Sequence, residues 1–359
     1  MMRSITAISA LALLTACGDG NPFCDLDDPD NLYCGTDEGE APDVEIELDG
    51  TEDPSASRSI SRIEPGTVTE DGRLIANDTF GGLVREVIYD EDSDTYTIDN
   101  LAFDGENEYE TSSVFPTLGG YPIYEAAEEV PDFLTSAAVG QIVPYVAVTG
   151  RSEVINPEGA DGEFEPRATF AIVRTGGYTD YGFGGFVYAR NGDVTLPTAG
   201  QAQFDGTYAG VRVFDKEATL EYTTGNVEVG FDFDDFNLNN GVKGTVSDRE
   251  LFDENGNPIP GFFVSDDLLP DLNFVVVQGV DTLLPTGELS GDLLSRRLND
   301  NGEIAIYEEG KYYAIIAGDS TAGDGGELVG VFVVESEDPR VDNLFVQETG
   351  GFILQRSQP

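Results

Sequence analysis

A strict alternation of apolar and polar residues in the second half of the chain most constrains how it can fold. Apolar side chains occupy every second position in the run Val227, Val229, Phe231 and Phe233. Because successive side chains of a strand point to opposite faces, this period of two predicts a strand with one buried face. Residues 311–316 and 328–334 are apolar almost without interruption, which is typical of strands covered on both faces.

Turn dipeptides flank such runs: Asn191-Gly192, Asn255-Gly256 and Asn301-Gly302. Asn-Gly favours the two-residue turns of β-hairpins, so the pattern predicts an antiparallel meander. A meander of about eight strands, with glycine at its bends, can close into a barrel and so remove its sheet edges. We therefore expect an antiparallel β-barrel of about eight strands over residues 191–359.

The chain ends close to an apolar run, residues 351–356. Left unpaired, this run would be an exposed hydrophobic edge, so we expect it to pair within the barrel. Phe352 and Leu354 share one parity and should face the interior. Residues 195–356 are expected to fold alone.

The sequence of residues 59–190 predicts a smaller β-rich domain. Residues 94–99, 144–148 and 168–173 combine β-branched and aromatic residues between Gly, Asp, Asn and Pro, as strands do. Only residues 124–139 have a helical pattern, and Pro131 interrupts it. The expected fold class is all-β.

Residues 17–58 are rich in Asp, Glu, Gly and Pro and have few aromatic residues. This composition predicts a disordered acidic tether, which charge repulsion keeps extended. The alternating residues 44–48 could form a short strand if they found a partner.

The chain begins with the pattern of a secretory signal peptide, residues 1–16. Arg3 precedes an apolar segment, residues 5–14, which is shorter than the roughly 20 residues that span a bilayer. Leu14-Thr15-Ala16-Cys17 resembles the bacterial lipobox. The resemblance implies cleavage before Cys17, diacylglycerol on its sulfur, and acylation of the new amino terminus, for example with palmitate. Gly18 rather than Asp follows Cys17, which favours the outer membrane. The alternative is an ordinary signal peptide with an incidental cysteine.

Two further cysteines, Cys24 and Cys34, lie in the acidic segment. An even pair in an oxidising compartment predicts a disulfide. The loop lies away from any expected core, so its stabilising effect should be local. Two of the four ligands of a structural zinc site would be missing.

The charge balance restricts the partners. The chain has 69 acidic and 18 basic residues, no His, and a net charge of −51. Such a surface repels nucleic acid and anionic lipid. A solvated surface suited to a saline habitat explains the charge more simply than a cationic ligand does, although both interpretations stay open.

Catalytic motifs are also missing from the sequence. Without His there is neither the commonest general base nor a Ser-His-Asp arrangement. No nucleophile elbow, phosphate loop or dinucleotide fingerprint occurs, so we expect no enzyme, cofactor or metal. Pairs of carboxylates, as in glycoside hydrolases, remain an alternative because acidic residues occur at every spacing.

Three stretches resemble the β-barrel domain of transferrin-binding protein B and the related factor H-binding lipoproteins. They are residues 196–210, residues 227–236 with 241–246, and residues 311–318 with 327–332. The resemblance implies a lipoprotein with a barrel domain of that kind. The large receptors of the family have two lobes, whereas this chain has room for one barrel and one smaller domain. Iron acquisition is therefore not carried over, and no ligand-contact residue matches.

Four features suggest candidate sites. Asp90, Asp92 and Asp94 have calcium-loop spacing, but Thr95 and Leu101 stand where such a loop needs Gly and Glu, so a solvated turn is favoured. A hairpin turn explains residues 253–257 without an ion.

The aromatic cluster comprises Tyr178, Tyr181, Phe183, Phe186 and Tyr188. It predicts either core packing, which we favour, or a binding surface. Arg296-Arg297 is the only Arg-Arg doublet in the chain; pairing with carboxylates is favoured over a partner contact.

The sequence thus predicts a non-enzymatic binding lipoprotein, anchored in the outer membrane through Cys17, that captures a protein or solute. The alternatives are a structural envelope lipoprotein without a small ligand and a carboxylate-based hydrolase.

Overall fold

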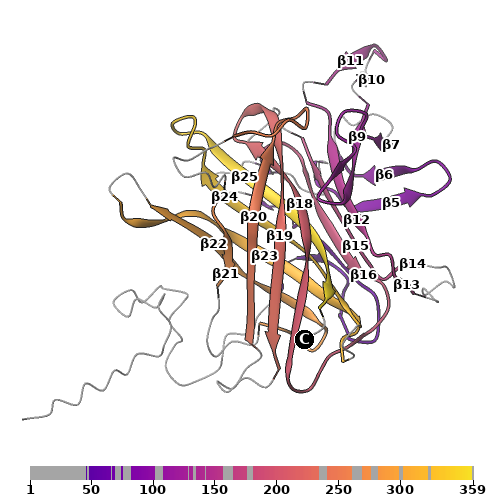
Figure 1. Ribbon diagram of the computed structural model, residues 1–359. Helices are drawn as coiled ribbons and strands as arrows, with labels where there is room; N and C mark the ends of the chain where they lie inside the picture. The colour runs from indigo at the N-terminus through magenta and orange to yellow at the C-terminus, as the bar shows by residue number, and fades with distance from the viewer. Residues whose placement is uncertain are drawn as a thin grey trace, which may run out of the picture.

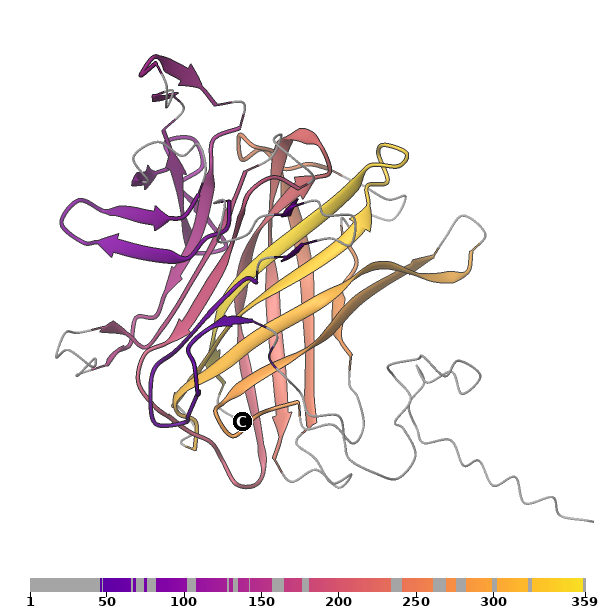
Figure 2. The ribbon, with the colours of Figure 1, turned by 180° about the vertical axis from the view of Figure 1, so that it is seen from behind.

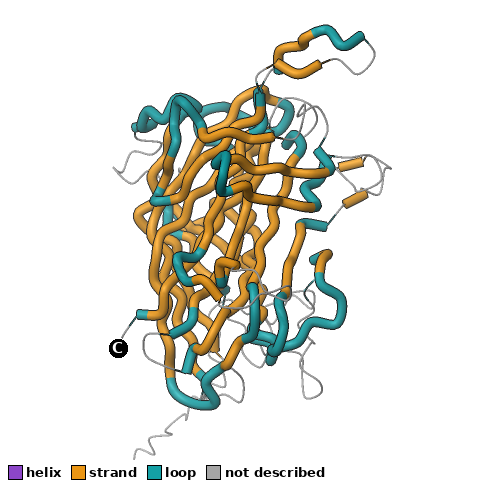
Figure 3. The backbone as a smooth tube through the Cα atoms, turned by 90° about the vertical axis from the view of Figure 1, so that its right-hand side faces the viewer, coloured by secondary structure: helices purple, strands orange, loops and turns teal. Residues whose placement is uncertain are grey.

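The computed structural model describes residues 46, 48–65, 67–68, 74–75, 82–101, 108–127, 129–131, 135–141, 143–156, 165–175, 181–233, 241–260, 269–275, 282–298, 302–321 and 325–357. These residues form strands and connecting loops without a helix (Figure 3). Two large sheets pack against each other, a closed barrel and a curled half-barrel (Figures 1 and 2). The expected all-β class is confirmed.

The barrel contains eight antiparallel strands. They are β18 (Gln201–Phe214), β19 (Glu217–Asp232), β20 (Gly241–Phe252), β21 (Leu272–Phe274), β22 (Glu288–Leu298), β23 (Ile304–Asp319), β24 (Glu327–Glu337) and β25 (Phe345–Arg356). The short β21 bridges β20 and β22, and β25 pairs with both β18 and β24. The pairing of β23 with β24 completes the ring, so the barrel has no continuous free edge among the described strands.

The half-barrel is the second large sheet. Its strands run in the order β1 (Asp49–Gly50), β2 (Ile60–Ile63), β16 (Gly184–Arg190), β15 (Ala168–Arg174), β12 (Val146–Arg151), β9 (Tyr121–Ala126), β7 (Glu108–Thr111), β6 (Thr95–Asp99) and β5 (Glu86–Asp90), with β8 (Thr117–Leu118) beside β9. Three short pairs lie apart: β3 (Thr67–Val68) with β4 (Leu74–Ile75), β10 (Glu129–Pro131) with β11 (Ala138–Gly140), and β13 (Ile155–Asn156) with β14 (Glu165–Pro166). The parallel partner of β23 is β17 (Val194–Thr195).

The two sheets share a core layer. Along β18, Tyr208 belongs to the core inside the barrel, while Ala209 and Val211 pack outside it against the half-barrel. This shared layer explains the continuously apolar runs: Val329 and Val331 face the half-barrel, and Leu328 and Phe332 face the barrel interior. The expectation that residues 311–316 and 328–334 form strands covered on both faces is confirmed for their buried centres.

The closing strand lies where the sequence predicted it. Within β25, Phe352 and Leu354 are fully buried in the barrel core. The alternation in β19 is confirmed as well, because Val227, Val229 and Phe231 belong to the same core.

The expected helix over residues 124–139 is wrong. Tyr121–Ala126 is β9, which pairs with β7 and β12, and a separate hairpin of β10 and β11 follows it. Ile123 and Tyr124 are both buried, on opposite faces of β9, so sheet packing on two sides overrides the local helical pattern.

The folded part begins earlier than expected. Leu48 is buried in the shared core, and β1 pairs with β2, so residues 48–58 belong to the half-barrel rather than to a tether. The signal peptide (1–16), Cys17, Cys24 and Cys34 lie outside the described residues.

One of the three predicted hairpin turns is wrong. Asn191-Gly192 joins β16 of the half-barrel to β17, which pairs parallel with β23, so this turn connects the two sheets. β22 and β23 do pair antiparallel on either side of Asn301-Gly302, although Asn301 itself lies outside the described residues. At Asn255-Gly256 the chain turns back after β20, and Asp253 N–H donates to Asn257 O. Across the described residues, no helix is long and apolar enough to cross a membrane.

Candidate functional site

A buried ion network fills one end of the barrel interior. Arg249 donates from Nη1 and Nη2 to the two carboxylate oxygens of Glu308 at 2.7 and 2.9 Å. Its Nη2 also donates to Glu348 Oε2 at 2.7 Å. The remaining oxygen of Glu348 accepts from Tyr208 and Thr223 at 3.1 and 3.0 Å. Because each carboxylate has several donors, these charges are tolerated away from water.

The network continues towards the β18–β19 turn. Arg212 Nη1 donates to Glu221 Oε2 at 2.8 Å, and Arg340 Nη1 donates to Glu221 Oε1 at 2.6 Å. Arg340 Nη2 also donates to Asp338 Oδ2 at 2.6 Å. Burial alone would raise the pKa of Asp338, but the hydrogen bonds and charge of Arg340 outweigh it and hold that pKa below its usual range.

The rest of the barrel interior is packed with aromatic and aliphatic side chains. Tyr312 stacks on Phe274 with ring centroids 4.0 Å apart, and Tyr208 meets Phe332 edge-on at 5.1 Å. Together with the ion network, these side chains fill the centre of the barrel. A ligand of appreciable size therefore has to bind at the ends or on the outer surface.

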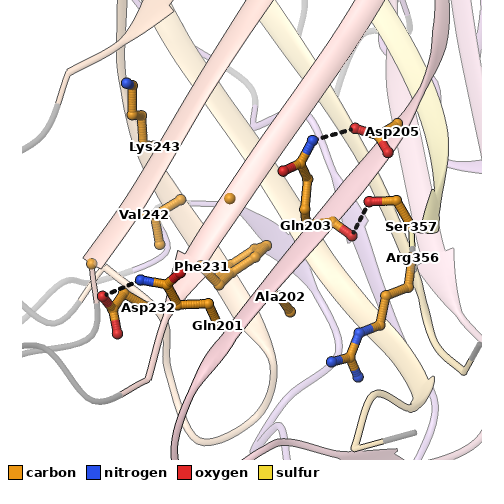
Figure 4. A pocket seen from close by; sticks show the side chains of 12 residues that line it. Gln201, Ala202, Gln203, Asp205, Phe231, Asp232, Val242, Lys243, Arg356 and Ser357 are labelled. Atoms are coloured by element: carbon orange, nitrogen blue, oxygen red, sulfur yellow. Dashed lines mark hydrogen bonds between the residues drawn. The ribbon is translucent and has the colours of Figure 1, made fainter. Parts of the chain in front are cut away.

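One hollow, which we call the rim hollow, lies at the end of the barrel opposite the ion network. It encloses about 840 Å³ where the first residues of β18, the last of β19, the first of β20 and the end of β25 meet (Figure 4). Ala202, Phe231 and Val242 supply apolar surface. Gln201, Gln203, Asp205, Asp232, Lys243, Arg356 and Ser357 supply polar groups around it.

Hydrogen bonds hold several of these polar groups in place. Gln201 Nε2 donates to Asp232 Oδ2 at 2.9 Å, and Gln203 Nε2 donates to Asp205 Oδ1 at 3.0 Å (Figure 4). The backbone N–H of Ser357 donates to Gln203 O at 2.9 Å and fixes the end of the chain beside the hollow. The rim hollow therefore has two cations (Lys243 and Arg356) and two carboxylates (Asp205 and Asp232) beside an apolar floor. Because rigid strands hold these groups, the hollow can bind a partly apolar group of either charge.

A second hollow, of about 790 Å³, lies on the concave face of the half-barrel. The guanidinium of Arg151 lies 4.0 Å from the ring centroid of Tyr89, and its Nη2 donates to Glu91 at 3.0 Å. The floor is made of small residues such as Ala171 and Ala189. Glu91 is exposed, so this ion pair adds little stability and leaves the hollow open to solvent.

The calcium-like aspartates do not converge. Asp90 Oδ1 accepts from the N–H groups of Asp92 and Ser93, which is the geometry of a local turn. Asp94 instead accepts from the hydroxyls of Tyr89 and Tyr124 at 2.9 and 2.8 Å. Among the described residues, no group of three or more acidic or cysteine side chains could hold a metal ion.

The other candidates have structural roles. Asp253 accepts from the N–H groups of Asn255 and Asn257 within the turn, as a hairpin explanation requires. Phe186 and Tyr188 are core residues, and Tyr181 and Phe183 pack on the core partly buried, while Tyr178 lies outside the described residues. The core interpretation of the aromatic cluster is therefore confirmed for the described members.

The Arg-Arg doublet lies near the end of the β22–β23 hairpin. The guanidinium of Arg297 lies 5.0 Å from the ring centroid of Tyr307. Arg296 is paired in register with Ile306.

Sequence reasoning missed the ion network entirely. Arg249, Glu308 and Glu348 look like ordinary surface charges in a chain with 69 acidic residues. The available signal was the alternation of inward and outward side chains along a strand. Glu308 lies four residues before Tyr312, and Glu348 lies four residues before Phe352, so each lies on the same strand face as a core residue.

The described residues define an all-β protein in which a closed eight-stranded barrel is backed by a curled half-barrel sheet. Among solved structures, the chain is similar to two mutant forms of the vaccine antigen transferrin-binding protein B from Haemophilus parasuis Hp5, with 15% and 14% sequence identity and TM-scores of 0.33 and 0.32. It is also similar to intact Ap-TbpB, which has N and C lobes, with 12% identity and a TM-score of 0.33.

Each of these matches covers 84% of this chain and 52% or 53% of the other, so the chain spans about half the length of those structures. They belong to the family that the sequence motifs resemble. No protein-family model and no curated protein sequence matches the chain.

Proposed function

We propose that the chain is a binding lipoprotein of the bacterial cell envelope, anchored in the outer membrane through lipid on Cys17, that captures a protein or solute and performs no catalysis. The observation that carries the binding function is the rim hollow. It combines apolar surface with both signs of charge on a barrel whose interior is already filled. A rigid scaffold with an outward site suits recognition, because little ordering is required on binding.

The anchor is tested by replacing the acylated sulfur. A Cys17→Ser variant cannot form the thioether to diacylglycerol, so it should move from the membrane fraction to the soluble fraction. Cys34→Ser is the matched control and should stay with the membrane. Wild-type protein found wholly in the soluble fraction would refute the anchor. Proteolysis of intact cells then tells whether the folded part faces outwards.

The site is tested by binding. Immobilised wild-type protein and the double variant Asp232→Asn/Lys243→Gln are incubated with culture medium and with solubilised envelope, and retained molecules are quantified by mass spectrometry. Lys216→Gln is the control, because Lys216 is an exposed cation in the turn at the opposite end of β18. A molecule retained by the wild type and the control but lost from the double variant supports the proposal. Retention of the same envelope proteins by all three points to the structural alternative.

We further propose that Cys24 and Cys34 form a disulfide that closes a short loop before the folded part. Mass spectrometry under non-reducing conditions should show the two cysteine peptides linked. Reduction should leave the melting temperature nearly unchanged, because the cross-link precedes β1, the first described strand, and restrains none of the described strand pairings. Two free thiols in protein from the native envelope would contradict the pairing.

A further inference from the structure

β5 is the last strand of the half-barrel sheet and has a strand partner on one side only. It pairs antiparallel with β6, and residues 86–90 pair with no other strand in the described part of the chain. In an antiparallel sheet every second residue directs its backbone N–H and C=O away from a given neighbour, so β5 offers such groups to a further strand. The β5–β6 hairpin stands out on the side of the half-barrel that faces away from the barrel (Figures 1 and 2).

The outer edge of β5 borders the hollow of about 790 Å³ on the concave face of the half-barrel. Four consecutive residues of β5, 86–89, line this hollow. Successive side chains of a strand point to opposite faces, so consecutive lining residues mean that the edge of the strand, rather than one of its faces, borders the space. The hollow therefore lies where the next strand of the sheet would run.

The hollow is closed at one end, where the chain before β5 meets β16. Leu83 forms a parallel bridge with Gly184, and Val84 N–H donates to Gly184 O at 3.1 Å. Beyond this point β5 follows β6, whereas β16 pairs with β15 and β2, so the two strands separate.

Small side chains form the floor between the separated strands. They come from β15 and β16 and lie in two rows of the register: Thr169 opposite Ala189, and Ala171 opposite Val187. The adjoining part of the concave face is filled by larger side chains, among them Tyr124. The floor of the hollow thus leaves room for the side chains of an inserted strand.

The two cations that line the hollow are each paired with a carboxylate. Arg85 Nη1 lies 3.0 Å from Asp49 Oδ2. Arg151 Nη2 lies 3.0 Å from Glu91 Oε1. Glu165 adds a further, exposed carboxylate to the lining. The lining therefore favours a cationic occupant over an anionic one.

The outer face of β5 points to the same chemistry. Glu86, Ile88 and Asp90 share this face, and all three are exposed. Neither Glu86 nor Asp90 forms an ion pair with a cation of the described residues. Opposite charges directly across two strands are stabilising and like charges are destabilising, so a strand added to β5 is favoured when it carries lysine or arginine on this face.

We propose that β5 and the hollow beside it are a docking site for an extended, basic segment of a partner protein. The segment adds to β5 through its backbone and directs aliphatic side chains into the hollow. Its lysine or arginine residues lie on the outer face beside Glu86 and Asp90. This docking site shares no lining residue with the rim hollow and does not depend on the function proposed for that hollow.

Other occupants fit the edge less well. If β5 paired antiparallel with β5 of a second copy about Ile88, Glu86 of each copy would lie opposite Asp90 of the other. Like charges at that position are destabilising, and the two chains would each carry a net charge of −51. An anionic bilayer is repelled by the same charge.

The probe for this proposal is a fluorescein-labelled peptide of alternating Lys and Val, titrated with the full chain and followed by fluorescence anisotropy. Salt at about 150 mM screens attraction by distant carboxylates. We expect saturable binding. Glu86→Gln/Asp90→Asn should weaken it about fivefold through the lost cross-strand charge pairs. Glu108→Gln/Glu110→Gln is the matched control, because it removes two exposed carboxylates from β7 of the same sheet and leaves the β5 edge intact.

Two further measurements separate strand addition from charge attraction. The same peptide with N-methyl groups on alternate amides keeps its charge but cannot pair as a strand, so it should bind about tenfold more weakly or worse. Ala189→Leu fills the floor of the hollow and should weaken binding of the unmodified peptide to a similar degree, in protein whose thermal melting shows that it is folded. Hydrogen exchange should show that the unmodified peptide protects amides within residues 86–90.

The proposal is overturned by absent binding, by equal binding of the methylated peptide, or by protection elsewhere than at β5. Equal loss of affinity in the β5 variant and the β7 control would also overturn it, because the attraction would then be one of net charge alone. A dimer in sedimentation that Glu86→Gln/Asp90→Asn strengthens would instead assign the edge to a second copy of the chain.

Discussion

Arg249 on β20 reaches across the interior of the barrel to Glu348 on β25, with 2.7 Å between Nη2 and Oε2. Neither strand is a neighbour of the other, because β19 and β18 stand between them in the sheet. Arg249 also pairs with Glu308 on β23, which lies three strands away in the other direction. Burial would lower the pKa of Arg249, but the two carboxylates outweigh it and raise that pKa well above its usual value. The side chain stays charged and acts as a cross-brace.

Replacing the cross-brace should destabilise the barrel strongly. Arg249→Met leaves buried Glu308 without the cation that binds both of its oxygens and leaves Glu348 only the more distant Arg212, 4.0 Å away, a situation that costs about 3–5 kcal/mol of unfolding free energy. Urea denaturation measures the loss. The control is Lys311→Gln, which removes the exposed pair with Asp292 and should change stability by at most about 1 kcal/mol. Equal midpoints for the two variants would show that the network does not hold the barrel together.

Much of the barrel could be predicted because burial on one face imposes a period of two. The run from Val227 to Phe233 and the closing strand with Phe352 needed only that rule, since a slip of one residue would expose every apolar side chain. The continuously apolar strands implied a second covered face. What covered it was not evident, because the half-barrel strands are short and interrupted.

Two classes of feature could not be predicted. Parity marks Glu348 as interior, but nothing local says that a partner, Arg249, comes from a strand about one hundred residues away to neutralise it. Likewise, Asn191-Gly192 specifies a turn, but it does not specify which of the two sheets the next strand joins. The rim hollow belongs to this class too, since its residues come from four strands whose ends meet only in the closed barrel.

Acid should weaken the folded state through Asp338. Its pKa is held below the usual 3.8 by Arg340, so its contribution to stability is fully present above the unfolded-state value. That contribution is lost as the pH falls below about 4 and through the folded-state pKa. Arg340→Gln should therefore lower stability at neutral pH and flatten the loss of stability between about pH 4 and about pH 2, which thermal melting at each pH measures. A wild-type melting temperature independent of pH below about 4 would refute the effect.

Close strand contact at Gly310 gives a steric prediction. A Cβ added there would lie 1.9 Å from the backbone oxygen of Val333, which cannot move aside without breaking the β23–β24 pairing. Gly310→Ala should therefore lower stability by about 1–3 kcal/mol, measured by urea denaturation. Gly230→Ala is the control, because the nearest atom to its added Cβ is 3.9 Å away. If both variants melt like the wild type, the β23–β24 contact is looser than described.

Separating the barrel from the half-barrel should expose its outer apolar face. Residues 195–356 contain every barrel strand, so we expect the isolated segment to fold with a β-type circular dichroism spectrum. Val211, Val329 and Val331 would then face water, since the half-barrel normally covers them. We therefore expect the segment to bind a hydrophobic dye and to self-associate, whereas the full chain does neither. A disordered spectrum would show that the barrel needs the half-barrel in order to fold.

The closing strand provides the sharpest test of the barrel. Phe352 is fully buried in the core, and a Cβ added at Gly330 on β24 would lie 2.7 Å from its ring. Phe352→Asp removes that packing and buries a carboxylate between Tyr208 and Gly330 in the sheet register, so we expect a loss of about 3–5 kcal/mol. Phe345→Asp is the matched control: it lies on the same strand, but the side chain is 48% exposed and carries its charge into water. Thermal melting of the full chain should therefore fall strongly for the first variant and little for the second. Because both introduce the same charge into the same strand, only burial inside a closed barrel accounts for a difference between them.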